Sequence, residues 1–268
     1  MSTVNYQQYD AIGIIELDDQ AALNALTPDG LIDLRNALIA CQADDEVRVI
    51  IITGAGDKAF CAGANLKKTD PPEQSFAKSA LSCKTIDSKG SGYTRLMDLS
   101  DLLIWKPMIA AINGYCLGGG LELAMQCDLR IASSNASFAL PEVKVGSVPA
   151  VGGVQALMRA IPAAHAMKLA LTGDRIDANA ALSVGLVSDI CAPDALISES
   201  RKIAVRIAAN GPLAVKTVKK LALETSHLAP ADFILQSNMA WGLLRDTKDR
   251  IEGRDAFNKK RKPNFTGD

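Results

Sequence analysis

The sequence predicts an α/β fold, because strand-like and helix-like segments alternate through its first two thirds. Apolar runs typical of buried strands occur at residues 9–18, 47–53 and 107–113, and beyond Gly153 the pattern is almost wholly helical. The chain has 268 residues, of which 48% are hydrophobic and 22% are charged. That length and composition suit a globular protein with a sizeable core.

Local signals place the remaining elements. Thr27 and Pro28 are an N-cap and a first-turn residue, and the helix they open carries Leu31, Leu34, Leu38 and Cys41 on one face. Shorter strands are expected at residues 128–132 and 138–140. Helices are then expected to end at Gly173 and Gly185, to be followed by a strand-like run at 186–191, and to begin near Pro193, Pro212 and Pro230. Residues 67–104 are the least regular part and predict a loop or lid that contains a short helix.

Composition excludes several classes of function. A formal net charge of −1 gives no electrostatic reason to bind nucleic acid or a membrane surface. The six cysteines are scattered without a CxxC pair, and no signal peptide is visible, so we expect a reducing, cytoplasmic location. The two histidines, His165 and His227, lie far apart, which disfavours a metal site or a Ser–His–Asp triad. Acid/base chemistry would therefore fall to carboxylates.

The run INGYCLGGGLELAMQCD, at residues 112–128, is the most informative motif. Its glycines, Gly118 to Gly120, end a strand-like stretch and open a helix whose first turn contains Glu122. Glycines let a ligand approach the backbone closely, and N–H groups at a helix start attract negative charge. A carboxylate beside such donors suggests acid/base chemistry on a substrate that develops an oxyanion. The alternative is a flexible turn in which Glu122 only complements the helix dipole.

Two further segments carry turn signals. Gly54, Gly56 and Ala59 match a loose dinucleotide fingerprint after a strand, but no helix follows, and the absence of GK[ST] excludes a P-loop. We expect instead a loop that exposes its backbone to a ligand near Gly63. In FALPEVKVGSVPAVGG, at residues 138–153, Pro141 fixes the backbone before Glu142, which could otherwise be a solvated loop carboxylate.

Together these segments resemble the crotonase superfamily, the enoyl-CoA hydratase/isomerase family. The matching residues are FCAGANLK at 60–67, the glycine run at 112–128, the segment at 138–153 and the tail EGRDAFNKKRKPNF at 252–265. The resemblance implies a crotonase-like spiral of repeated ββα units over residues 1–195. It also implies a helical C-terminal trimerisation region over residues 196–268, with assembly as a homo-trimer or a dimer of trimers.

The resemblance also implies a substrate and a site. The substrate would be an acyl thioester of coenzyme A, with no separate cofactor and no metal. Its oxyanion would be held by the backbone N–H groups of Ala64 and Gly119. Other residues implied to contact the substrate or its CoA moiety are Ala62, Lys67, Gly118, Ala150, Phe257 and Lys260. For the lysines the alternative is a solvated surface residue, and for Phe257 it is packing against the core.

Two glutamates distinguish the members of the family that hydrate a double bond, and both positions are glutamate here. Carried over by position, Glu142 would donate a proton to Cα and Glu122 would orient and activate water. A specialised dehydratase or hydratase, a double-bond isomerase and a non-catalytic binding protein remain as alternatives. The sequence departs from the family at Asn65, where many members have an acid, and at Ala150–Val151, where many have a glycine after the proline.

The acyl pocket is expected to be walled by the irregular segment at residues 67–105. Its candidate wall residues are Phe76, Tyr93, Leu96, Met97 and Trp105. These apolar side chains could instead hold a lid to the core.

Overall fold

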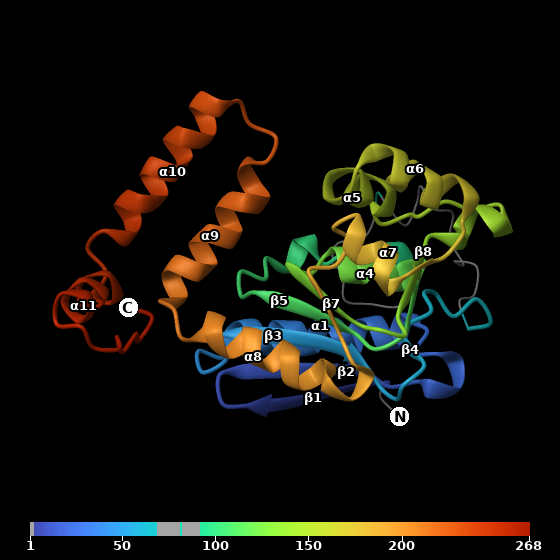
Figure 1. The fold of residues 1–268 in the computed structure, drawn as a ribbon, viewed down its shortest axis with the longest axis horizontal. Coiled ribbons are helices and arrows are strands. Elements are labelled where there is room, and N and C mark those ends of the chain that lie inside the picture. Colours follow the sequence, from blue (N-terminus) through green and yellow to red (C-terminus); the bar gives the residue numbers. More distant parts are fainter. Residues whose placement is uncertain (1–2, 69–80, 82–91) are drawn as a thin grey trace.

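The structure, a computed structural model, describes residues 3–68, 81 and 92–268. It contains two sheets enclosed by helices, with a group of C-terminal helices that extends away from both sheets (Figure 1). The α/β class predicted from the sequence is confirmed. Phe76 lies outside the described residues.

The larger sheet has six strands in the order β1-β2-β3-β5-β7-β10. β1 runs antiparallel to β2, and the other neighbouring pairs are parallel. The strands are β1 (Val4–Tyr9), β2 (Ile12–Leu17), β3 (Val49–Gly54), β5 (Met108–Ile112), β7 (Leu129–Ser133) and β10 (Asp189–Cys191). Strands therefore form at the predicted apolar runs. The sequence does not predict β1, because only Val4 in this edge strand is buried.

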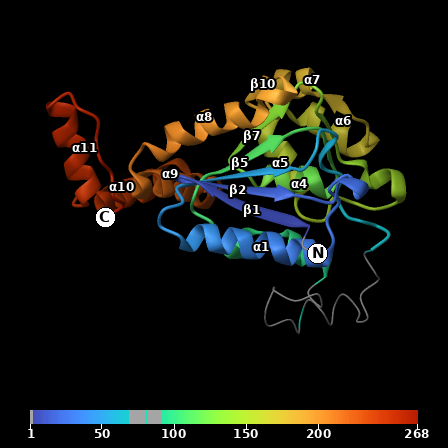
Figure 2. The ribbon, with the colours of Figure 1, turned by 90° about the horizontal axis from the view of Figure 1, so that it is seen from below.

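Successive side chains along a strand point to opposite faces of the larger sheet, so they pack into two separate cores. Ile50 and Ile52 face the core that contains the apolar side of α1 (Pro28–Ala43). Val49 and Ile51 face the opposite core, which α8 (Leu196–Ala208) covers. Figure 2 shows these two helices on opposite faces of the sheet. The Thr27 side chain accepts a hydrogen bond from the backbone N–H of Gly30 (3.1 Å), which confirms the predicted N-cap.

The smaller sheet has four strands in the order β4-β6-β8-β9. These are β4 (Ala59–Cys61), β6 (Tyr115–Leu117), β8 (Ser137–Ala139) and β9 (Ile176–Asp177). The first three are parallel, and β9 is antiparallel to β8. Because β4, β6 and β8 are parallel neighbours, their carboxyl ends meet at one edge of this sheet.

Shorter helices and turns connect the strands of the two sheets. They are α3 (Tyr93–Met97), α4 (Gly119–Met125), α5 (Gly153–Ala160), α6 (Ala163–Thr172) and α7 (Ala178–Ser183), with the 3-10 turns η1 (Gln20–Ala22), η3 (Ser100–Leu102), η4 (Pro141–Val145) and η5 (Pro193–Ala195). Gly173 caps α6 in the left-handed conformation, and α7 ends two residues before Gly185, as predicted.

The C-terminal group comprises α9 (Pro212–Thr225), α10 (Pro230–Leu244) and α11 (Lys248–Asn258), and it lies to the left of the sheets in Figure 1. α8, which follows the predicted domain boundary at residue 195, packs on the larger sheet instead. The boundary itself stays a prediction. α10 has no buried residue, and its large apolar side chains are exposed at Phe233, Ile234, Leu235, Met239, Trp241 and Leu243. Among the described residues, no helix is long and apolar enough to cross a membrane.

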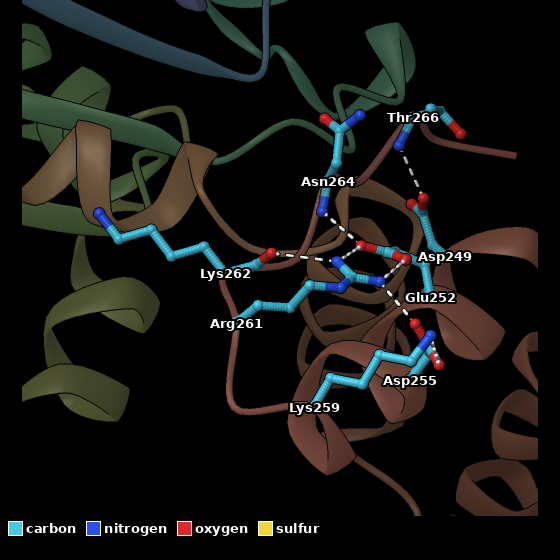
Figure 3. A network of polar contacts seen from close by, with 8 residues as sticks. All are labelled: Asp249, Glu252, Asp255, Lys259, Arg261, Lys262, Asn264 and Thr266. Atoms are coloured by element: carbon cyan, nitrogen blue, oxygen red, sulfur yellow. Dashed lines mark hydrogen bonds and ion pairs between the residues drawn. The ribbon is translucent and has the colours of Figure 1, made fainter.

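The tail after α11 folds back onto that helix. Arg261 makes bidentate contacts with Glu252 (2.6 and 2.7 Å) and a further ion pair with Asp255 (2.7 Å), as Figure 3 shows. The Asp249 carboxylate accepts hydrogen bonds from the backbone N–H groups of Thr266 (2.7 Å) and Gly267 (3.0 Å). These contacts give the end of the chain a defined path.

Lys219 connects α9 to the larger sheet. Its buried ammonium group donates to the carbonyl oxygen of Lys106 (2.9 Å) and pairs with Asp128 Oδ2 (2.8 Å). Asp128 in turn accepts a hydrogen bond from the backbone N–H of Met108 at the start of β5 (2.7 Å). The ammonium group thus holds the middle of α9 where β5 and β7 begin.

We predict that Lys219→Met lowers the free energy of unfolding by on the order of 2 kcal/mol, because it leaves Asp128 partly buried without its cation. Lys202→Met is the control, since Lys202 on α8 pairs with Glu199 on the exposed surface. Its loss should cost less than about 1 kcal/mol. Chemical denaturation of both variants measures the difference, and equal stability of the two would contradict the anchoring role of Lys219.

Candidate active site

The carboxyl ends of β4, β6 and β8 bring the three sequence motifs together. β4 leads into the turn that contains Gly63 and Ala64, and β6 leads into the glycine turn at the start of α4. β8 leads through Leu140 into η4, which carries Glu142. Segments separated by up to 80 residues in sequence therefore meet at one sheet edge, a common position for ligand sites in α/β proteins.

The start of α4 approaches β4 more closely than any side chain would allow. A methyl group on Gly120 would lie 2.1 Å from the carbonyl oxygen of Cys61, far inside van der Waals contact. One on Gly63, which has φ +94°, would lie 3.1 Å from the backbone nitrogen of Gly119. Glycine is thus required for close packing, and the turn that contains Ala64 lies directly beside Gly119.

Glu122 is held rigidly in the first turn of α4 and is only 4% exposed. Its Oε1 accepts hydrogen bonds from the backbone N–H groups of Val151 (2.7 Å) and Gly153 (3.0 Å). Gly153 is the first residue of α5, so the carboxylate also lies at the positive end of a helix dipole. A methyl group on Gly153 would lie 2.9 Å from Glu122 Cγ, so this contact too depends on glycine.

Glu142 faces the same glycine turn from η4. A methyl group on Gly118 would lie 3.0 Å from Glu142 Oε1. The other carboxylate oxygen, Oε2, is buried and receives no hydrogen bond from any described residue. This burial contradicts the alternative of a solvated loop carboxylate. Leaving such a group buried and unpaired is unfavourable, which is typical of a position that a ligand or water completes.

Burial raises the pKa of both carboxyl groups. Desolvation is the largest cause for Glu122 and outweighs the N–H donors of Val151 and Gly153, which lower its pKa. For Glu142 desolvation is again the largest cause; a backbone hydrogen bond opposes it, and the negative charge of Glu122 adds to the rise. Both carboxyl groups are thus protonated more readily than in water, and the charge of Glu122 adds to this effect for Glu142.

The two predicted oxyanion donors point to no internal partner. Within the described parts of the chain, the backbone N–H groups of Ala64 and Gly119 donate to no protein acceptor. By contrast, Ala62 donates to the carbonyl oxygen of Leu23 (3.1 Å), and Gly118 donates to that of Ala139 (2.9 Å). The geometry therefore leaves the two N–H groups that the resemblance assigns to the oxyanion available for a ligand.

The other predicted CoA contacts are spread more widely. Lys67 is exposed shortly after the first turn, and Ala150 is exposed in the turn before α5. Phe257 is 83% exposed on α11, and Lys260 lies in the tail that folds back on it. Figure 1 places α11 and the smaller sheet at opposite sides of the chain. Within one chain, the structure does not bring Phe257 or Lys260 to the glutamates.

The residues expected to depart from the family pattern make defined contacts. Asn65 is buried, and its Oδ1 accepts a hydrogen bond from the backbone N–H of Lys67 (3.2 Å). An amide oxygen thus closes the turn where many members have an acid. Val151 contacts Glu122 through its backbone N–H, which any residue but proline supplies.

Among the candidate wall residues, the described contacts bring only Tyr93 to the glycine turn. A methyl group on Gly119 would lie 2.3 Å from its hydroxyl oxygen. Leu96 and Met97 are fully buried in the main core, and Trp105 contacts Lys220 of α9. The hydrogen bonds from Val151 and Gly153 to Glu122 are a feature of the candidate site that the sequence did not reveal. The one related signal in the sequence was the pair of glycines after Pro149, which indicated a tight turn there.

Comparison with known proteins identifies the family. A family model described as enoyl-CoA hydratase/isomerase matches residues 7–268. The chain belongs to this family. An (E)-benzylidenesuccinyl-CoA hydratase from Thauera aromatica is 44% identical over 256 residues, which cover 96% of each chain. A crotonyl-CoA hydratase from Syntrophomonas wolfei is 38% identical over 97% of this chain and 96% of its own.

Solved structures agree with this family assignment. The crystal structure of an enoyl-CoA hydratase from Bacillus anthracis superimposes with a TM-score of 0.89 at 32% identity and covers 100% of both chains. The two mixed sheets and the C-terminal helices are thus those of the crotonase fold. As a member of the enoyl-CoA hydratase/isomerase family, the chain is expected to act on acyl-CoA substrates.

The raised pKa of Glu142 predicts a pH-dependent effect on stability. An ionised carboxyl group with a raised pKa destabilises the folded state, so its cost is absent below the unfolded-state pKa of about 4.3, grows as pH rises from there to the folded pKa, and is complete above it. Glu142→Gln should therefore unfold at a higher temperature than the parent at pH 7–8, and the two should converge below about pH 4.

The Glu252→Gln variant is a control in which the expected change in stability has the opposite sign. Hydrogen bonds from Arg261 lower the pKa of Glu252 to about 2, so its stabilising effect is present at neutral pH and is lost only in acid. This variant should unfold at a lower temperature at pH 7. Thermal unfolding across pH measures both, and a stability gain for Glu142→Gln that does not change with pH would refute the electrostatic explanation.

Proposed function

We propose that this chain is an enoyl-CoA hydratase that reversibly adds water across the 2,3 double bond of a 2-enoyl-CoA. The main support is the convergence of Glu122 and Glu142 on the glycine turn whose Gly119 N–H is free to bind an oxyanion. A hydratase needs one group to activate water, one to protonate the substrate, and donors for the thioester oxygen. These are the groups at this sheet edge.

In the proposed reaction the thioester oxygen accepts hydrogen bonds from the N–H groups of Ala64 and Gly119. Water oxygen attacks C3, and the electron pair of the C2=C3 bond moves toward the thioester, whose oxygen gains negative charge. Glu142 gives its proton to C2, while the proton lost by water returns to the Glu122–Glu142 pair. The pair therefore ends with the one proton with which it began, and no external acid or base is consumed.

The two glutamates have different environments that suit these roles. Glu122 uses one oxygen to accept from two backbone N–H groups, which fixes its orientation and leaves the other oxygen for water. Glu142 has a buried oxygen without a partner among the described residues, where a proton can reside and be passed to carbon. The negative charge of Glu122 also favours the protonated form of Glu142.

We predict that Glu142→Gln lowers kcat for hydration by roughly 10²–10⁴-fold, the range that a general acid contributes. Binding of butyryl-CoA, which cannot be hydrated, should change little, because glutamine keeps the shape of the side chain. Glu224→Gln is the control, since Glu224 is exposed on α9 and pairs with Lys220 of the same helix. Undiminished turnover in the Glu142 variant would exclude its role as the acid.

A panel of substrates can identify the acyl group, with hydration of each measured as the loss of enoyl thioester absorbance. The relatives named above act, by their names, on acyl groups as different as benzylidenesuccinyl and crotonyl. The panel should therefore contain crotonyl-CoA, longer straight and branched enoyl-CoAs, and an aryl-substituted one. Migration of the double bond without hydration would favour the isomerase alternative. Binding without any conversion would favour a non-catalytic protein.

We further propose that the chain assembles as a homo-trimer or a dimer of trimers through its C-terminal helices. The exposed apolar side chains of α10 support this, because large apolar side chains gathered on one exposed helix are typical of an interface. In such an assembly Phe257 and Lys260 would reach the CoA moiety of another copy, with Lys67, Ala62 and Ala150 contributing from the same chain. A cytoplasmic location stays a prediction.

A further inference from the structure

Tyr93 places a hydroxyl group directly on the glycine turn. It is the first residue of α3, and its oxygen occupies the position that a methyl group on Gly119 would need, at 2.3 Å. The Gly119 nitrogen, the proposed oxyanion donor, is one covalent bond from that α-carbon. The hydroxyl therefore lies beside the place where the thioester oxygen is expected to bind.

This position is fixed by the packing of α3. Leu96 and Met97 of that helix are fully buried in the main core. The guanidinium of Arg35, itself only 5% exposed on α1, donates to the carbonyl oxygens of Leu96 (3.3 Å) and Asp98 (2.8 Å). A helix held in this way aims Tyr93 at the turn without help from a ligand.

The Tyr93 hydroxyl has no partner within the described chain. Its oxygen is buried and makes no hydrogen bond there, and the same holds for Glu142 Oε2 on the other side of the glycine turn. Two buried polar atoms that face one turn and lack partners are unusual in a folded protein. A substrate between them would satisfy both.

We propose that the Tyr93 hydroxyl is a third hydrogen-bond donor to the thioester oxygen, in addition to the backbone N–H groups of Ala64 and Gly119. This assignment rests on the proposed function. It makes Tyr93 a catalytic residue in the strict sense, because the hydroxyl would contact the atom on which negative charge develops. A donor placed there before reaction stabilises the enolate more than the substrate and therefore raises kcat.

Two features favour the thioester oxygen over the carboxylates as the acceptor. The hydroxyl lies against Gly119, and Glu122 already directs one oxygen to the backbone of Val151 and Gly153. The phenol also stays protonated throughout the working pH range. Desolvation is the largest cause that raises its pKa, followed by the charges of Cys61, Glu122 and Glu142. It can therefore donate a hydrogen bond but does not compete with the glutamates as a base.

The first test is kinetic and uses Tyr93→Phe, which keeps the ring and removes only the hydroxyl. We expect kcat with crotonyl-CoA to fall by about tenfold to a hundredfold, with little change in KM. Tyr9→Phe is the matched control, because Tyr9 lies at the end of the exposed edge strand β1 and its hydroxyl donates to the nearby Gln7 side chain. It should retain parental activity. An unchanged kcat in Tyr93→Phe would overturn the proposal.

A second measurement separates this inference from the proposed function. Isotope-edited infrared spectroscopy of butyryl-CoA labelled with ¹³C at the thioester carbonyl reports hydrogen bonding to that oxygen without turnover. The parent protein should lower the carbonyl stretching frequency on binding, and Tyr93→Phe should lower it less. Equal shifts in both proteins would contradict a contact of Tyr93 with the thioester oxygen. No shift in the parent would instead contradict the oxyanion site itself, and with it the proposed function.

Discussion

The close approach of α4 to β4 is the constraint on which the site depends. Gly120 packs against the carbonyl oxygen of Cys61 too closely for any side chain to fit between them. Gly63, in the turn after β4, packs in the same way against the backbone nitrogen of Gly119. This contact places the turn that contains Ala64 beside the first residue of α4, Gly119. It also fixes the direction of α4, and so the position of Glu122 in its first turn. The glycine run is therefore a rigid packing element, which disfavours the alternative of a flexible turn.

Electrostatics give the two carboxylates different tasks within one small volume. Both are taken from water, which raises the pKa of each. Glu122 Oε1 accepts two backbone hydrogen bonds near the start of α5, whereas a single backbone hydrogen bond opposes the rise for Glu142. Glu142 and Tyr93 are left with buried polar atoms that lack partners among the described residues. The fold thus carries an unfavourable arrangement at this edge of the smaller sheet. Such arrangements are common where a ligand completes the hydrogen bonding, because binding then relieves the cost.

Local pattern was sufficient for much of the fold. The buried strand at Val49–Gly54 and the helix capped by Thr27 follow from residues close to one another in sequence. The positions of Glu122 and Glu142 came from the resemblance to a family, whereas their shared environment required the structure. The hydrogen bonds from Val151 and Gly153 to Glu122 span about 30 residues, and nothing in the local sequence encodes such a pairing. The edge strand β1 and the position of Tyr93 also depend on tertiary contacts rather than on periodicity.

The most direct measurement of the central claim is a crystal structure of the protein with butyryl-CoA bound. We expect the thioester oxygen within hydrogen-bonding distance of the backbone nitrogens of Ala64 and Gly119, with C2 of the acyl group facing Glu142. We also expect a water molecule between the two glutamates, where the unpartnered Oε2 of Glu142 can reach it. A thioester bound elsewhere, or one whose oxygen contacts neither nitrogen, would contradict the account.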